Sequence, residues 1–270
     1  MPRSPLRYPG GKQKAIARIL RCFPTDFQEL REPFVGGGSV FLAVLGQQPH
    51  LSCWINDLNP ELYWFWHCVQ ADLSALVQRV QQIHGETQDG RALFAELAAV
   101  NPETLAPLAR AVRFFVLNRI TFSGTIESGG YSQASFATRF TTSSIQRLAD
   151  LTGWLPQTRI THGDYRELLQ APGDNVFVFL DPPYLSKTHS RLYGRQGDLH
   201  TGFDHQRFAQ EMAACPHRWL ITYDDCPEVR ESFAFAYCYE WELQYGMNNY
   251  KQAKAERGRE LFLSNYPIPG

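Results

Sequence analysis

The chain has 270 residues, and its 26 lysines and arginines are balanced by 27 aspartates and glutamates. This balance excludes the strongly basic class of nucleic-acid-binding proteins, so a nucleic-acid partner would have to be bound by local basic faces. The six cysteines form no CxxC pair, and the sequence contains neither an apolar signal core nor an uncharged run of roughly 20 residues. We therefore expect a cytoplasmic protein with no disulfide framework, no metal site and no membrane span.

The first quarter of the chain predicts a loop, a helix and the start of a βαβ unit. A loop at 7–12 leads into a helix whose apolar residues at positions 16, 19, 20 and 23 share one face. A short strand at 33–35, three glycines at 36–38 and an apolar helix at 40–45 follow. A second strand is expected at 51–55, ending at Asn56 and Asp57.

The middle of the chain has a different pattern, which predicts an inserted helical domain. Positions 59 to about 120 are mainly helical, and the Ser-, Thr- and Gly-rich stretch at 122–144 indicates an exposed, flexible loop or hairpin. Strand patterns return at 159–162, 176–180, 219–223, 236–245 and 260–266. The expected fold is an α/β domain made of residues 1–58 and 158–270, with a helical insert at 59–157.

The block Asp181-Pro182-Pro183-Tyr184 directly follows the apolar run at 176–180. Such a run indicates a strand buried on both faces of a parallel sheet, and its carboxyl end is where open α/β sheets carry their chemistry. The Asp181 carboxylate and the Pro182 carbonyl would each accept one N–H of a planar exocyclic amine, while Pro183 stiffens the turn. Tyr184 would stack on a base that has left the duplex. The block predicts methyl transfer to such an amine.

A second set of residues predicts a site for an adenosine cofactor. In the segment from Phe34 to Ser39, Gly36 and Gly38 would let a ligand approach the backbone, and Asp57 is spaced to bind ribose hydroxyls. Phe41 stands where a dinucleotide-binding fingerprint requires glycine, which weakens a nicotinamide reading. Asp164 would accept the adenine amino group of the cofactor, and the loop that ends at Lys12 would hold its carboxylate.

Five blocks in this order give the chain a clear resemblance to the Dam-like, alpha-group DNA N6-adenine methyltransferases, a Rossmann-like family that uses S-adenosylmethionine. The resemblance covers most of the chain. It implies that Tyr8, Lys12 and Asp57 contact the cofactor, that Asp181 lies beside cofactor and target amine, and that the helical insert recognises the DNA target. The blocks are Tyr8-Pro9-Gly10-Gly11-Lys12, Glu32-Pro33-Phe34-Val35-Gly36-Gly37-Gly38-Ser39-Val40-Phe41, Asn56-Asp57-Leu58-Asn59, Leu117-Asn118-Arg119 and Asp181-Pro182-Pro183-Tyr184.

The expected DNA contacts are Arg119, Ser123, Glu127, Lys187 and Arg191. Relatives that methylate GATC carry a basic residue where this chain has Glu127, and a carboxylate accepts from cytosine N4 but does not grip guanine as arginine does. We therefore expect a recognition sequence other than GATC. The basic loop after the catalytic turn, and a second basic cluster at positions 251, 254, 257 and 259, would contact phosphates.

The sequence leaves several alternatives open. The same acceptor pair would serve an N4-cytosine methyltransferase, although Asp rather than Ser at position 181 favours adenine. RNA or protein-glutamine methylation and a catalytically idle DNA-binding protein of the same fold are further alternatives. The expected partner is double-stranded DNA, bound by a monomer or weak dimer, and a cognate restriction endonuclease encoded nearby is a candidate partner. The setting (restriction-modification, phage or independent regulatory enzyme) is left open.

Overall fold

The structure is a computed structural model that describes residues 2–8, 10–126, 129–185, 202–244 and 257–268. Glu127, Lys187 and Arg191, three of the expected DNA contacts, lie outside the described residues, as do positions 251 and 254 of the second basic cluster. Within the described part, no helix is both long enough and apolar enough to cross a membrane.

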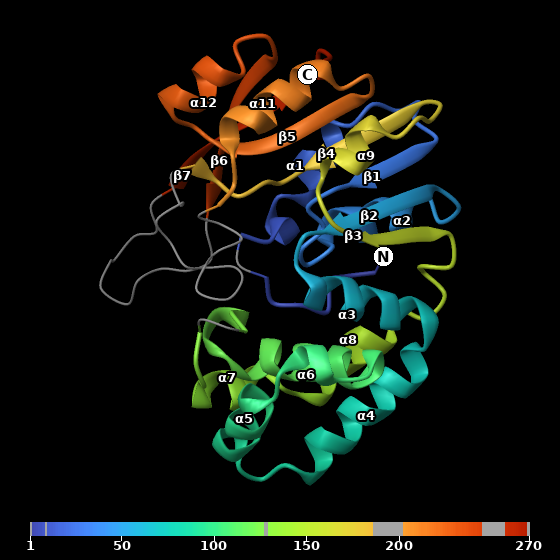
Figure 1. The fold of residues 1–270 in the computed structure, drawn as a ribbon, viewed down its shortest axis with the longest axis vertical. Coiled ribbons are helices and arrows are strands. Elements are labelled where there is room, and N and C mark those ends of the chain that lie inside the picture. The colour runs from blue at the N-terminus through green and yellow to red at the C-terminus, as the bar shows by residue number, and fades with distance from the viewer. Residues whose placement is uncertain (1, 9, 127–128, 186–201, 245–256, 269–270) are drawn as a thin grey trace.

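A seven-stranded sheet in the order β3-β2-β1-β4-β5-β7-β6 forms the centre of the upper part of the molecule (Figure 1). The first five strands pair in parallel, whereas β7 is antiparallel to both β5 and β6. This arrangement confirms the predicted Rossmann-like α/β fold class. The strands are β1 (Glu29–Glu32), β2 (Ser52–Asp57), β3 (Thr158–His162), β4 (Val176–Leu180), β5 (Arg218–Asp224), β6 (Tyr237–Gln244) and β7 (Arg257–Ser264).

Helices cover both faces of the sheet, so that β4 is buried along its whole length, as its apolar run predicts. Phe177 and Phe179 point into the core on one face, while Val176, Val178 and Leu180 point into the core on the other. On the first face lie α1 (Ile16–Arg21) and α2 (Ser39–Gln47), and on the second lie α9 (Arg166–Gln170), α11 (His205–Ala214) and α12 (Pro227–Ser232).

The first strand lies earlier than the sequence predicts. Residues 33–35 form a turn, and β1 is the polar segment Glu29–Glu32. Arg31 and Glu32 are nevertheless buried, because each charge has partners in the fold. The Arg31 guanidinium donates to the carbonyls of Leu168, Ala171 and Pro172, and Glu32 Oε2 accepts from Phe41 N at 2.9 Å. Long-range hydrogen bonds thus offset the burial of charges in a central strand.

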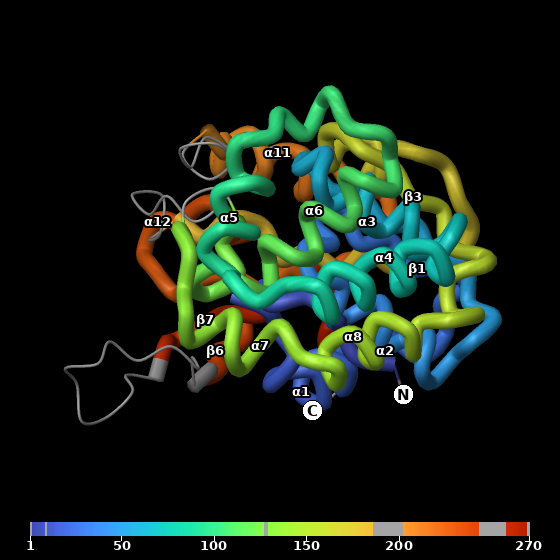
Figure 2. Tube along the Cα trace, turned by 90° about the horizontal axis from the view of Figure 1, so that it is seen from below, coloured from blue at the N-terminus to red at the C-terminus, as the bar shows by residue number. Residues whose placement is uncertain are grey.

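Between β2 and β3, the residues that the structure describes form the α-helices of the lower part of the molecule, as Figures 1 and 2 show. They are α3 (Pro60–Ala71), α4 (Leu73–Glu86), α5 (Gly90–Ala99), α6 (Pro107–Ile120), α7 (Gln133–Arg139) and α8 (Thr142–Ala149). The buried face of α6 packs against α3, α4, α5 and α7. Short 3-10 turns occur at Lys12–Lys14, Pro102–Thr104 and Phe122–Gly124.

The loop or hairpin expected over 122–144 is in part helical. Its first half contains a bridge between Thr121 and Tyr131, but Gln133–Arg139 forms α7, and α8 begins at Thr142. The Ser132 hydroxyl accepts from Ser135 N at 3.1 Å and caps α7. The serines that suggest a loop therefore act as helix caps here.

Candidate active site

A cavity of about 310 Å³ opens at the carboxyl ends of the parallel strands, a volume within the usual range of small-molecule sites. At this edge, the connection after β1 leads to β2 and the connection after β4 leads to β5, so the two run in opposite directions. Ligands bind at such a point in open α/β sheets. Each of the strands β1 to β4 supplies one carboxylate to the cavity lining, namely Glu32 from β1, Asp57 from β2, Asp164 after β3 and Asp181 after β4. Asp204, at the start of α11, supplies a fifth. The cavity is therefore acidic.

The glycine loop between β1 and α2 forms the floor of the cavity beside Tyr8. Gly36 has φ +45°, and a Cβ added there would lie 2.7 Å from Tyr8 Cε1, so a side chain is excluded. Gly38 also has positive φ, +67°, and begins α2, where Trp66 and Phe41 leave no room for a side chain. Tyr8, Gly36 and Gly38 all line the cavity, as expected for cofactor contacts.

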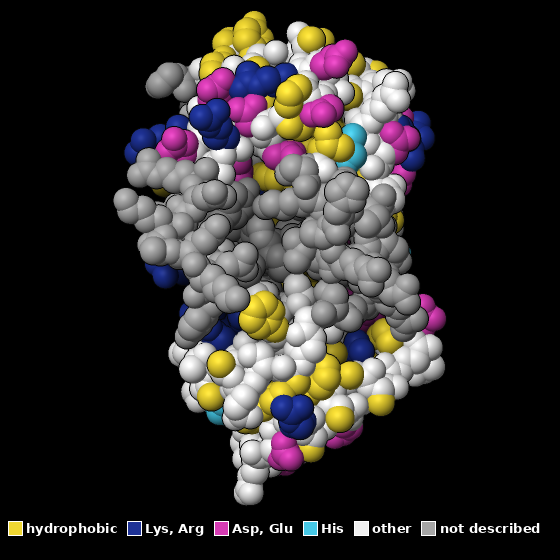
Figure 3. Space-filling model, turned by 90° about the vertical axis from the view of Figure 1, so that its left-hand side faces the viewer, with side chains coloured by type: hydrophobic (Ala, Val, Ile, Leu, Met, Phe, Trp, Pro, Cys, Tyr) yellow, Lys and Arg dark blue, Asp and Glu magenta, His cyan; other side chains and the backbone are white. Residues whose placement is uncertain are grey.

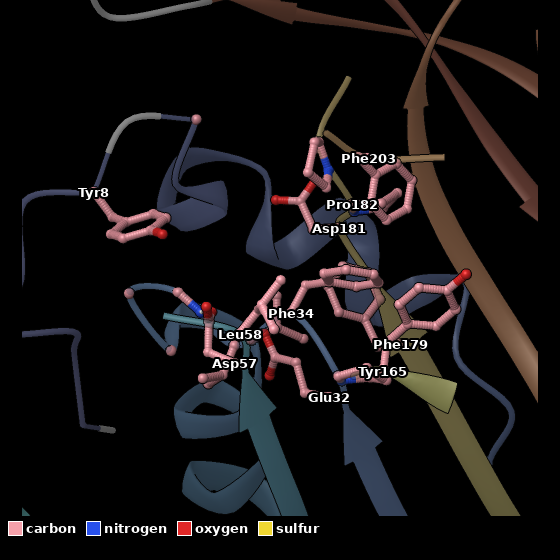
Figure 4. Close-up of a pocket in the computed structure, with 18 of the residues that line it drawn as sticks. Tyr8, Glu32, Phe34, Asp57, Leu58, Tyr165, Phe179, Asp181, Pro182 and Phe203 are labelled. Atoms are coloured by element: carbon pink, nitrogen blue, oxygen red, sulfur yellow. The ribbon is translucent and has the colours of Figure 1, made fainter. Parts of the chain in front are cut away.

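Asp57 is held rigidly at the end of β2. Its Oδ2 accepts from Gly36 N and its Oδ1 from Asn59 N, both at 2.9 Å. Burial raises the pKa of Asp57 to about 6, and the two backbone hydrogen bonds oppose that rise. Figure 4 shows Asp57 across the cavity from Asp181. The remaining lone pairs of a carboxylate fixed in this way suit ribose hydroxyls.

Asp164 lies at the more exposed rim. Its Oδ1 accepts from N of Arg166, the first residue of α9, at 2.9 Å, and its Oδ2 pairs with Arg207 Nη2 at 3.0 Å. Arg207 lines the same cavity and was not among the residues expected from the sequence. A cofactor amino group at Asp164 would therefore share this carboxylate with two existing donors.

Asp181 is the most strongly held polar group of the site. Thr222 on β5 donates from Oγ1 to Asp181 Oδ1 at 2.8 Å, and Lys12 Nζ donates to Asp181 Oδ2 at 2.8 Å. Lys12 is only 4% exposed and also donates to Gly10 O at 3.1 Å. Lys12, the ammonium expected to hold a cofactor carboxylate, lines the cavity and is paired with Asp181. Thr222 lies inside an apolar strand run, which gave no sequence signal for its role.

The rest of the turn 181–184 is anchored to β7 and β5. Tyr184 is buried, with 7% exposure, and its hydroxyl donates to Glu260 Oε2 at 3.0 Å. Its ring stacks on Tyr223 at a centroid distance of 5.9 Å, and Lys12 Nζ lies 5.0 Å from its centroid. Pro182 and Pro183 line the cavity with Tyr184. The turn is therefore preorganised, with much of the Tyr184 ring already packed against protein.

Glu32 is a buried carboxylate of the cavity that the sequence did not single out. It is 3% exposed, and its pKa is raised well above the usual value, first by burial and then by the nearby negative charges of Asp181 and Asp57. Its place four residues before Gly36 could have indicated it, since residues at strand ends line the sites of open α/β sheets.

Aromatic rings form the wall opposite Tyr8, as Figure 4 shows. Phe34 packs on Tyr165 at 5.3 Å and on Phe203 at 5.7 Å between ring centroids. Phe34 was expected near the cofactor, whereas Tyr165 and Phe203 were not. A wall of rings beside carboxylates suits a ligand that combines a flat aromatic group with polar or cationic groups.

The DNA contacts expected in the insert require one correction. Arg119 is 4% exposed, and its guanidinium donates to the carbonyls of Arg139 at 2.8 Å and Pro5 at 3.2 Å. Burial and three neighbouring arginines lower its pKa. Because the side chain is buried and two of its donors bind carbonyls inside the protein, the structure places Arg119 in the interior and not on a surface that DNA could contact.

Ser123 lies in the short turn at the end of α6 with φ 55°, next to Phe122, which is 66% exposed. On the face in Figure 3, the helical part of the molecule presents hydrophobic and isolated basic side chains. The turn at 122–124 is thus an accessible element of the insert.

Comparison with known proteins gives matches along most of the chain. The family described as D12 class N6 adenine-specific DNA methyltransferase matches residues 8–247. The DNA N-6-adenine-methyltransferase of Escherichia phage P1 is 26% identical over 238 residues, 86% of this chain and 31% of that protein. The type II methyltransferase M1.LlaDCHI of Lactococcus lactis subsp. cremoris is 20% identical, over 76% and 71% of the two chains. A DNA adenine methylase of Vibrio cholerae is 23% identical, over 66% and 64%. The chain thus spans about a third of the phage protein.

Proposed function

Because the chain belongs to the D12 class N6 adenine-specific DNA methyltransferase family, we propose that it transfers the methyl group of S-adenosylmethionine to N6 of an adenine flipped out of double-stranded DNA. The observation that carries this proposal is the Asp181 carboxylate, which is fixed by Lys12 and Thr222 at the edge of an acidic, aromatic-walled cavity. We further propose that the helical insert at 59–157 selects the DNA target.

The cavity suits S-adenosylmethionine by its chemistry. When bound, this cofactor supplies a methyl group on a positively charged sulfur, and after the C–S bond breaks the sulfur is left as a neutral thioether. The cofactor also carries an ammonium group. Five carboxylic acid side chains against Lys12 and Arg207 give the lining an acidic character that favours a cation. Asp57 would hold the ribose hydroxyls, Tyr8 and the glycine loop would hold the methionine portion, and Asp164 would accept from the adenine amino group.

Asp181 and the Pro182 carbonyl would act on the target amine. Each accepts one N–H, which localises the nitrogen lone pair and directs it away from the ring. Lys12 and Thr222 fix the carboxylate before the base arrives, so little reorganisation is required during the reaction. As the new N–C bond forms, N6 becomes positive, and the adjacent Asp181 stabilises that charge until the extra proton leaves to the carboxylate or to water.

The turn at 122–124 would meet the DNA. The exposed ring of Phe122 offers a surface on which a base can stack, and Ser123 offers a hydroxyl beside it. Glu127, Lys187 and Arg191 remain proposed DNA contacts on the grounds of their sequence positions. Phosphate contacts by basic residues would make duplex binding strongly dependent on salt.

The test is methylation of unmethylated genomic DNA with a donor labelled in its methyl group, followed by digestion to nucleosides. Label in N6-methyladenine, lost in an Asp181→Ala variant, supports the proposal. Label in N4-methylcytosine would replace it with the cytosine alternative, and DNA binding without any incorporation would favour an idle DNA-binding protein. Long-read detection of modified bases in cells with and without the gene would then give the recognition sequence.

A further inference from the structure

The N-terminal segment, defined here as residues 2–8, is held between the helical insert and the cavity. Pro5 and Arg7 are bonded to the end of α6, and Ser4 Oγ donates to the carbonyl of Gly37 in the glycine loop. In Figure 2 the N-terminus lies beside α2 and α8, where the two parts of the molecule meet. The segment therefore touches both parts within a few residues.

Asn118 is the residue that joins this segment to the insert. It is 1% exposed; its Oδ1 accepts from Arg7 N at 2.9 Å, and its Nδ2 donates to Arg7 O at 2.7 Å. The same Nδ2 also donates to Gly124 O at 3.1 Å. One buried amide thus uses both of its N–H groups and its oxygen to bind two separate backbone stretches.

On the insert side, the Asn118 amide binds Gly124 O in the turn that carries Phe122. Gly124 has φ +76°, and a Cβ built there would collide with the carbonyl of Arg7, so the turn and the N-terminal segment are in direct contact. The Arg7 guanidinium also donates to Thr121 O at 3.2 Å. A displacement of this turn would therefore displace Arg7.

On the cavity side, Arg7 is followed by Tyr8, whose ring fills the space above Gly36. Tyr8 O accepts from Gly11 N at 3.0 Å, and Lys12 directly after it holds Asp181. A displacement of Arg7 would accordingly reach the proposed cofactor contacts and the catalytic carboxylate through the main chain.

We propose that Asn118 is a positioning residue that couples DNA engagement at the turn 122–124 to cofactor binding at Tyr8 and the glycine loop. The proposal rests on the proposed function. Coupling of this kind is reciprocal, so duplex DNA should raise the affinity for cofactor by the same factor as cofactor raises the affinity for DNA. Asn118 carries this role because its one buried amide joins Arg7 O, directly before Tyr8, to Gly124 O in the turn.

The experiment measures the Kd of S-adenosylhomocysteine, which resembles the cofactor but has no methyl to transfer, with and without saturating duplex. The duplex is one that the wild-type enzyme has been shown to methylate. We expect the wild-type ratio of the two Kd values to be about fivefold or more, within the usual range of coupling between sites. Asn118→Asp retains the acceptor for Arg7 N but loses both donors, and it should lower the ratio to about twofold or less while leaving the Kd without DNA within about twofold.

Arg113→Gln is the matched control. Arg113 is also buried in α6, and its Nε donates to Leu97 O at 2.7 Å, a bond within the insert that does not involve the N-terminal segment. This variant should lose stability but keep the wild-type ratio. Equal loss of coupling in Arg113→Gln, an unchanged ratio in folded Asn118→Asp, or a wild-type ratio near one would each overturn the proposal.

Arg7→Met provides a second variant if Asn118→Asp does not fold. It removes the guanidinium bonds to Thr121 O, Arg119 O and Ser135 Oγ but leaves the main-chain pairing with Asn118, so the ratio should fall part of the way toward one. A ratio equal to that of wild type would count against coupling through this segment. An enzyme that methylates no DNA would refute the proposed function, whereas an active enzyme with undisturbed ratios would refute only the role of Asn118.

Discussion

Replacing Thr222 by valine would test whether Asp181 is a preorganised acceptor. Thr222 is fully buried and makes one hydrogen bond, of 2.8 Å, to Asp181 Oδ1, and valine has nearly the same shape. A hydrogen bond to a charged group contributes about 1.5–3 kcal/mol. If that energy serves to orient the carboxylate in the transition state, its loss lowers the rate about tenfold to a hundredfold, since about 1.4 kcal/mol corresponds to a factor of ten.

The measurement is single-turnover methyl transfer at saturating donor and DNA, which isolates the chemical step from binding and product release. We expect a lower rate with unchanged Kd values for donor and DNA, and a thermal midpoint lowered by only a few degrees. Thr121→Val is the matched control, because Thr121 is equally buried and its hydroxyl bonds only the carbonyl of Leu117. A folded Thr222→Val enzyme with the wild-type rate would refute the reasoning and would leave Lys12 as the group that orients Asp181.

Three further predictions concern the same site and the insert. Asp181→Ala should abolish methyl transfer without unfolding the protein, because it removes an acceptor and not core volume; measurable turnover in the purified variant would exclude the proposed role. Glu32→Gln should gain stability relative to wild type as pH rises. Burial raises the pKa of Glu32 in the folded protein above its unfolded value near 4.5. The stabilising contribution of the Glu32 carboxyl is therefore complete below the unfolded pKa and is lost as pH rises through the folded pKa. Urea unfolding at several pH values checks this, and a difference that is constant with pH would contradict it. Phe122→Ala should weaken duplex binding roughly tenfold, as expected for one lost stacking contact, and leave the Kd for donor without DNA unchanged; equal DNA affinity in the two proteins would remove Phe122 from the interface.

Several features of the fold and site were predictable from sequence because they depend on local pattern. The run at 176–180 is apolar and β-branched without alternation, and it forms the fully buried β4, with Asp181 at its end. The glycines at 36–38 and Asp57 at the end of β2 likewise line one cavity, because parallel strands bring their carboxyl ends to one edge. Chain order and strand direction were sufficient to place these groups together.

The first strand was misplaced because its stability comes from distant residues. Glu29–Glu32 has only one apolar residue, Leu30, so no hydrophobic period marks it. Arg31 is buried because carbonyls more than 130 positions later accept from its guanidinium. Such partners follow from the fold, and a local pattern contains no information about them. The same reasoning applies to Thr222, whose partner Asp181 lies 41 positions earlier on the neighbouring strand.

The roles of Lys12 and Arg119 follow from one electrostatic rule. A buried cation is tolerated only where acceptors surround it, and each of these residues meets that condition through atoms far away in sequence. Lys12 accordingly pairs with Asp181, and Arg119 donates to the carbonyls of Pro5 and Arg139. Arg119 fixes the N-terminal segment, and Lys12 fixes the Asp181 carboxylate. Loss of either residue would therefore reduce activity even though neither is expected to touch DNA. Activity loss alone would therefore not identify a DNA contact in this enzyme, and a direct measurement of DNA affinity is required for each proposed contact.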